Sequence, residues 1–120
     1  MSLTYETFVK EMLDWFPFLS SECDSYMDED EPLPYLAVGC VLNPWIEARL
    51  AEHDVANILR ACQFLEIAST EGRSDARLAG LIRIEIGEWL PQVEERSLLL
   101  SHFGSETRIL CSYHISRLPD

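Results

Sequence analysis

The chain has 120 residues, of which 48% are hydrophobic, and its formal net charge is −12 at pH 7. This length suits a single domain, and the apolar fraction can fill a hydrophobic core, which argues against a disordered chain. The strong negative charge argues against nucleic acid and against a membrane surface as partners, and it favours a basic protein. No apolar run approaches the roughly 20 residues that cross a bilayer, and no secretory signal is recognisable, so we expect a cytoplasmic protein.

The first predicted element is an amphipathic helix over residues 5–16. Apolar residues recur there with the helical period, at positions 5, 8, 9, 12, 13 and 16. Thr4 is the expected N-cap. Pro17 is expected to end the helix, because the residue before a proline avoids the α conformation.

Residues 20–33 are acidic and offer little to bury. Nine of the first 31 residues are acidic and Lys10 is their only basic neighbour, so this quarter of the chain holds −8 of the total charge. We expect a long acidic loop with one helical turn near residues 21–27. The acids lack the alternating spacing and the central glycine of a calcium loop, so no metal site is predicted here.

Residues 33–42 are almost continuously apolar, a pattern that suits a buried helix or a buried strand. Helix is favoured, because the rest of the chain is helical. Asn43 is then expected to be an N-cap and Pro44 the first residue of a separate short helix that runs to about Glu52.

Two longer helices are predicted over residues 54–70 and 74–90. Asp54 should cap the first helix and Ser74 or Asp75 the second, while Gly72 suits a left-handed position between them. The connection is short, so the two helices should form an antiparallel hairpin.

Shorter helices are expected over residues 94–103 and from residue 105 to near the C-terminus, with Pro91 and Gly104 as the breaks before them. The predicted fold is an all-α, compact single-domain bundle of five to seven helices, with the antiparallel hairpin at its centre.

No residue pattern indicates a reaction. Cys111 and His114 form a C-x2-H pair, which falls short of the four ligands of a zinc site. Glu85 and Glu88 lie one helical turn apart, where a solvated helix face is the simplest explanation; burial of Glu85 would raise its pKa and favour chemistry. We predict no catalytic residue, no metal ion and no cofactor.

The acidic quarter is the candidate binding site, because aromatic residues are interspersed with its carboxylates. Exposed rings among acids suit an interface that steers its partner by charge and anchors it by aromatic contacts. The predicted partner-binding residues are Trp15, Tyr26, Asp28, Glu29, Asp30 and Glu31.

Several short motifs resemble a family of small all-helical bacterial proteins of unknown function. In size and charge, such proteins resemble immunity proteins that neutralise secreted bacterial toxins. No catalytic residues are carried over by this resemblance, and the acidic stretch at 20–31 departs from the pattern, so the choice of partner is not carried over either. The motifs are Tyr5-Glu6-Thr7-Phe8-Val9-Lys10, Phe16-Pro17, Leu42-Asn43-Pro44-Trp45, Phe64-Leu65-Glu66-Ile67-Ala68 and Gly104-Ser105-Glu106-Thr107.

The leading hypothesis is a non-enzymatic, acidic protein-binding module, such as an immunity protein or antitoxin that masks a basic partner, and it is expected to be a monomer or a homodimer. One alternative is a secretion chaperone or adaptor, which should dimerise and present an apolar groove. Another is a small hydrolase or metal enzyme, which would need a deep pocket lined by Glu85 and histidines.

Overall fold

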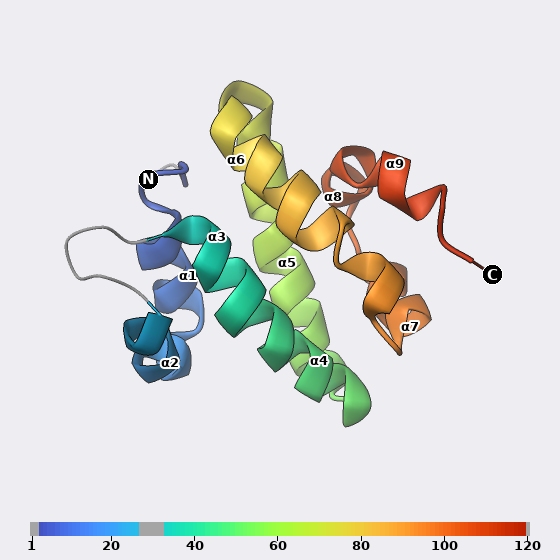
Figure 1. Cartoon of the computed structure of the whole chain (residues 1–120), viewed down its shortest axis with the longest axis horizontal. Coiled ribbons are helices and arrows are strands. Elements are labelled where there is room, and N and C mark those ends of the chain that lie inside the picture. Colours follow the sequence, from blue (N-terminus) through green and yellow to red (C-terminus); the bar gives the residue numbers. More distant parts are fainter. Residues whose placement is uncertain (1–2, 27–32, 120) are drawn as a thin grey trace.

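Helices form all the regular structure in residues 3–26 and 33–119, the part of the chain that the computed structural model describes (Figure 1). They enclose one core, and the all-α prediction is confirmed. The α-helices in chain order are α1 (Phe8–Trp15), α2 (Ser20–Tyr26), α3 (Pro34–Leu36), α4 (Asn43–Ala51), α5 (Val55–Glu71), α6 (Ala76–Ile82), α7 (Arg96–Ser101), α8 (Ser105–Leu110) and α9 (Ser112–Ile115). Between them lie the 3-10 turns η1 (Pro17–Leu19), η3 (Gly72–Ser74) and η5 (Leu90–Gln92) and the π-helical segments η2 (Ala37–Leu42) and η4 (Arg83–Gly87).

Aromatic rings dock α1 on α5. The ring of Phe64 lies 5.4 Å from that of Phe8 and 5.7 Å from that of Phe16, measured between centroids, and all three side chains are fully buried. Such ring pairs stabilise a fold beyond the area that they bury. This aromatic cluster therefore attaches α1 to α5.

The regular part of α1 begins at Phe8, three residues later than predicted, but Thr4 still acts as a cap. The hydroxyl of Thr4 accepts a hydrogen bond from the Thr7 N–H (3.2 Å), and the Thr7 hydroxyl accepts one from the Thr4 N–H (2.9 Å). This reciprocal pair has the logic of a capping box. The Tyr5 N–H donates to the carboxylate of Asp75 (2.9 Å), which ties this start of the chain to α6.

The helical turn expected near residues 21–27 is confirmed, and it extends over the whole of α2, so residues 20–26 are helix rather than loop. Cys23 anchors α2 by burying its side chain in the core. The predicted binding residues Asp28, Glu29, Asp30 and Glu31 lie outside the described residues.

Residues 34–51 form one continuous helical rod of α3, η2 and α4. Helix over residues 33–42 is thus confirmed, but the separate helix start at Asn43 is wrong. Asn43 has helical torsion angles (φ −60°, ψ −46°), and its N–H bonds to the Val38 carbonyl five residues earlier. We attribute the wide turn to Pro44, which has no N–H to offer in the interior of a helix.

A second rod, made of α6 and η4, lies beside the first, and both descend in the same direction in Figure 1. The Asn43 side-chain amide donates to the Glu85 carbonyl (2.9 Å), and the Trp89 indole N–H donates to the Glu47 carboxylate (2.5 Å). A Cβ atom on Gly39 would lie 2.6 Å from Oε1 of Glu85. The glycine therefore makes room for the carboxylate of Glu85 between the two rods.

The two predicted helix caps in the central region are confirmed. The carboxylate of Asp54 accepts from the Asn57 N–H (3.3 Å), and that of Asp75 accepts from the Leu78 N–H (3.2 Å). Gly72, however, is right-handed (φ −62°). Its role is a close approach, because a Cβ atom there would lie 3.2 Å from Cα of Ala79. Helices α5 and α6 pack together across this connection, and their antiparallel geometry remains a prediction.

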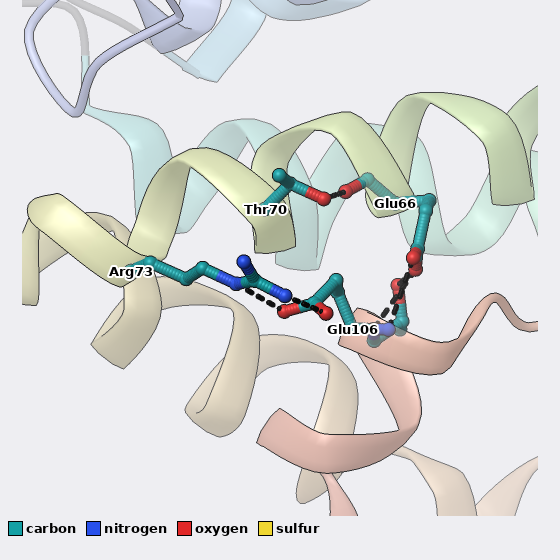
Figure 2. Close-up of polar contacts among 5 residues, drawn as sticks. Glu66, Thr70, Arg73 and Glu106 are labelled. Atoms are coloured by element: carbon teal, nitrogen blue, oxygen red, sulfur yellow. Dashed lines mark hydrogen bonds and ion pairs between the residues drawn. The ribbon is translucent and has the colours of Figure 1, made fainter.

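The N-terminus of α8 is capped from another helix, α5 (Figure 2). The carboxylate of Glu66 accepts hydrogen bonds from the N–H groups of Glu106 (2.9 Å) and Thr107 (3.0 Å) and from the Thr107 hydroxyl (2.9 Å). Beside it, the Arg73 guanidinium binds both carboxylate oxygens of Glu106 and thereby lowers the pKa of that carboxyl. These contacts fasten the C-terminal helices to the central one.

None of the helices in the described ranges is both long enough and apolar enough to cross a bilayer.

Candidate functional site

Two of the predicted site residues, Trp15 and Tyr26, lie in the described part of the chain, and they differ in exposure. Trp15 is half-buried, and the Arg60 guanidinium lies over its ring at 5.0 Å while also donating to the Trp15 carbonyl (2.8 Å). With Glu11 and Asp14, these two residues line a hollow of about 230 Å³. Tyr26, at the end of α2, is 51% exposed. Tyr26 is therefore free to contact a partner, whereas Trp15 can do so only beside Arg60.

A further exposed ring belongs to Phe18, which follows Pro17 in η1. Its side chain is 58% exposed, and its ring lies 5.4 Å from that of Trp45 on α4. Trp45 is half-buried, and the guanidinium of Arg49 lies 5.7 Å from its ring. Phe18 was not among the predicted site residues, although it follows a helix end, where a ring lacks neighbours along the helix to cover it.

A second acidic surface lies between α4 and the segment that follows η5. We call this hollow of about 680 Å³ the acidic groove. Three glutamates line it over a partly apolar floor, and none of its lining residues is Arg or Lys. At its rim, Nε2 of His53 lies 3.8 Å from Oε2 of Glu95, and the Arg96 guanidinium donates to the Val93 carbonyl (3.4 Å). The lining residues are Pro44, Glu47, Ala48, Leu50, Ala51, Gln92, Val93, Glu94 and Glu95.

A smaller hollow of about 270 Å³ adjoins the acidic groove, and the two share Gln92. We call it the recess. It lies between the π-helical segments of the two rods and carries two more glutamates, again without an Arg or Lys in its lining. The lining residues are Gly39, Asn43, Ile84, Glu85, Glu88, Trp89 and Gln92.

Two features of the recess are unusual for a plain helix surface. Burial, together with the negative charge of Glu88, raises the pKa of Glu85. Asn43 is 3% exposed, and its side-chain amide N–H donates a hydrogen bond to the Glu85 carbonyl. Its Oδ1 has no hydrogen-bond partner among the described residues. The recess thus holds an excess of hydrogen-bond acceptors, which a cationic donor could satisfy.

Glu85 should make the folded protein less stable at neutral pH than a neutral side chain would. Because its pKa is raised on folding, the folded chain binds a proton more readily than the unfolded chain, whose Glu85 has its ordinary pKa of 4.5. The free energy of unfolding therefore falls as the pH rises from 4.5 through the folded value. We expect Glu85→Gln to raise the free energy of unfolding at pH 7 and to change it little at pH 4, as measured by urea unfolding.

The substitution Glu94→Gln is the matched control, since it removes one negative charge from an exposed position nearby. If Glu85→Gln changed the unfolding free energy equally at the two pH values, the proposed cost of ionising Glu85 would be wrong.

Three of the four thiols offer little nucleophilic character. Cys23, Cys62 and Cys111 are buried, and burial raises the pKa of Cys62 and of Cys111 to about 12. In residues 3–26 and 33–119, no three His, Cys, Asp or Glu side chains converge as a metal site would require. The chemistry that the two hollows do offer is the acceptance of hydrogen bonds and positive charge.

The acidic groove was missed from the sequence for a physical reason. Glu47 belongs to the first rod, whereas Glu94 and Glu95 follow the second, and only the packing of the rods brings them to one hollow. No spacing along the chain signals this. The sequence showed Glu85 and Glu88 as an i,i+3 pair. It did not show that Asn43, which was predicted to be a helix cap, lines the same recess.

Comparisons with known protein families, with curated proteins and with solved structures found no match for this chain.

Proposed function

We propose that this protein is a non-enzymatic binding module that docks a basic protein in the cytoplasm, as an immunity protein or antitoxin would. One observation carries the proposal. Five glutamates line two adjoining hollows whose linings contain no Arg or Lys: Glu47, Glu85, Glu88, Glu94 and Glu95. Carboxylates gathered in this way repel one another, and a basic surface placed against them would relieve that repulsion.

The remaining charge adds to this attraction over a longer range. The net charge of −12 gives the whole molecule a negative potential, and residues 22–31 concentrate six acids in one short segment of the chain. Such a field speeds the association of an oppositely charged protein by a factor of about 10 to 1,000. We therefore assign steering to the acidic segment at 22–31 and contact to the acidic groove and the recess.

Exposed aromatic rings supply the anchoring that charge alone lacks. Tyr26 and Phe18 both lie in the acidic N-terminal quarter and are more than half exposed. Tyr rings in particular are enriched among the residues that dominate binding energy at interfaces. The predicted contacts Trp15 and Asp28 to Glu31 belong to the same quarter of the sequence and are kept in this proposal.

The test is capture of a partner by the whole protein in about 50 mM salt, where charge attraction is weakly screened, followed by identification of what binds. A triple variant, Glu47→Gln with Glu94→Gln and Glu95→Gln, is compared with a control, Glu6→Gln with Glu52→Gln and Glu71→Gln, which removes the same charge outside the steering segment and outside both hollows. We expect one saturable, basic partner that the wild type and the control retain and that the groove variant loses.

Two results would count against the proposed function. One is a captured protein that is acidic or neutral. The other is a basic partner that the groove variant retains as well as the wild type does, since the acidic groove would then not be the contact surface.

A further inference from the structure

We propose that the recess binds the guanidinium group of an arginine side chain that the basic partner presents. This inference rests on the proposed function and names the group that the partner must supply. It follows from the hydrogen-bond acceptors that line the recess and from the absence of an Arg or Lys side chain among the lining residues.

The first argument is the unsatisfied amide oxygen. Asn43 is 3% exposed, and its Nδ2 is fixed by the hydrogen bond to the Glu85 carbonyl, so its Oδ1 cannot be exchanged for a donor by flipping the amide. That oxygen has no partner in the described part of the chain. A buried acceptor without a donor is unfavourable, and nearly all such groups in folded proteins find a partner. Because Asn43 lines the recess, a donor that enters the recess is the group that would satisfy this oxygen.

The second argument is charge. The carboxylate of Glu85 lies over Gly39, where the absence of a side chain leaves room for it, and Glu88 adds a second negative charge one turn away. The two carboxylates and the Asn43 oxygen are all acceptors. The group that complements them must donate several hydrogen bonds and carry a positive charge.

The third argument selects guanidinium among cations. A divalent metal ion would need more converging ligands than the described ranges provide, since no cluster of three such side chains occurs there. An ammonium group has three donors but is strongly hydrated. Guanidinium has five donors in one plane, is less strongly hydrated and stacks on aromatic rings, and Trp89 lines the recess.

The experiment is a titration of the 15N-labelled protein with Nα-acetyl-arginine amide, followed by amide chemical shifts. We expect saturable shifts centred on Gly39, Asn43, Glu85 and Glu88. Nα-acetyl-citrulline amide, which has the same shape without the charge, should bind at least about tenfold more weakly, because a charge-assisted hydrogen bond is roughly twice as strong as a neutral one. Nα-acetyl-lysine amide should be weaker than the arginine compound.

Variants locate the binding. Glu85→Gln should weaken binding of the arginine compound at least about tenfold, whereas Glu52→Gln removes the same charge from an exposed position outside both hollows and should change it less than about twofold. Gly39→Ala is a second variant. Its new methyl group would displace the Glu85 carboxylate, and alanine is the better helix former, so we expect a folded protein with weakened binding.

The inference is overturned if the citrulline compound binds as well as the arginine compound, if the shifts spread over the whole acidic surface, or if Glu85→Gln and Glu52→Gln weaken binding equally. Its failure is distinguishable from failure of the proposed function. A basic partner that the acidic groove still captures, in a protein whose recess ignores arginine, would leave the proposed function standing and remove only this site.

Discussion

Replacing Phe64 by alanine should lower the free energy of unfolding by about 4 kcal/mol, the largest loss that we expect from a single substitution. Phe64 is fully buried, and its ring contacts those of Phe8, Trp15 and Phe16 at centroid distances between 5.4 and 5.8 Å. Truncation removes apolar contact and leaves a cavity that the helices on either side can only partly fill. It also loosens the N-terminal segment from α5.

Urea unfolding followed by tryptophan fluorescence measures this loss, with Ile67→Ala as the matched control. Ile67 lies on the same helix and is 41% exposed, so its truncation should cost less than about 1 kcal/mol. If the two variants were equally destabilised, the aromatic cluster would not be the main attachment between α1 and α5.

The second large effect should follow from Glu66→Ala, which we expect to destabilise the fold by about 2 kcal/mol. The carboxylate of Glu66 accepts three hydrogen bonds at the start of α8 (Figure 2), two of them from backbone N–H groups that have no partner within that helix. Thr107 is fully buried, so water cannot easily replace what its groups lose. Glu66→Gln retains one acceptor oxygen and should lose about half as much.

Thermal and urea unfolding of both variants, alongside Gln63→Ala, measure this effect. Gln63 is exposed on the same helix, and its replacement by the best helix former should be nearly neutral. A loss for Glu66→Ala no greater than that for Gln63→Ala would mean that the cap contributes nothing. Hydrogen exchange should also show faster opening of the amides of Glu106 and Thr107 in the Glu66 variants.

The sequence predicted best those features that depend on neighbours within a few residues. Asp54 and Asp75 are caps because their side chains reach the N–H group three residues later, whatever the rest of the fold does. The stripe of apolar residues in the first helix likewise identified Phe8, Met12 and Phe16 as core. Both signals are local, so packing had little scope to override them.

The wrong predictions arose where distant contacts decided the conformation. Asn43-Pro44 has the form of a helix start, yet the rod continues through it, because a π turn accommodates the proline and Glu85 binds the asparagine side chain. Gly72 is the residue type expected at a left-handed helix cap, but here a glycine is needed only because Ala79 packs too closely to leave room for a side chain. In each case the residue type was informative, and the reason for it lay on another helix.

In the candidate site, too, the sequence predicted the local features and missed those that depend on distant contacts. Charge along the chain pointed to the N-terminal quarter, and Tyr26 is indeed exposed there, although Trp15 lies partly covered beneath Arg60. The acidic groove and the recess could not be predicted, because their glutamates come from two rods that only the folded core brings together.

The most direct measurement of the central claim, that this acidic surface binds a basic protein, is the association rate with the captured partner at rising ionic strength. Stopped-flow mixing of the wild type should show a rate that falls at least about tenfold between 0.05 and 0.5 M salt, and a flatter dependence for a variant that carries Asp28→Asn, Glu29→Gln, Asp30→Asn and Glu31→Gln in the steering segment. An association rate that does not change with salt, or that falls equally in both proteins, would contradict the account.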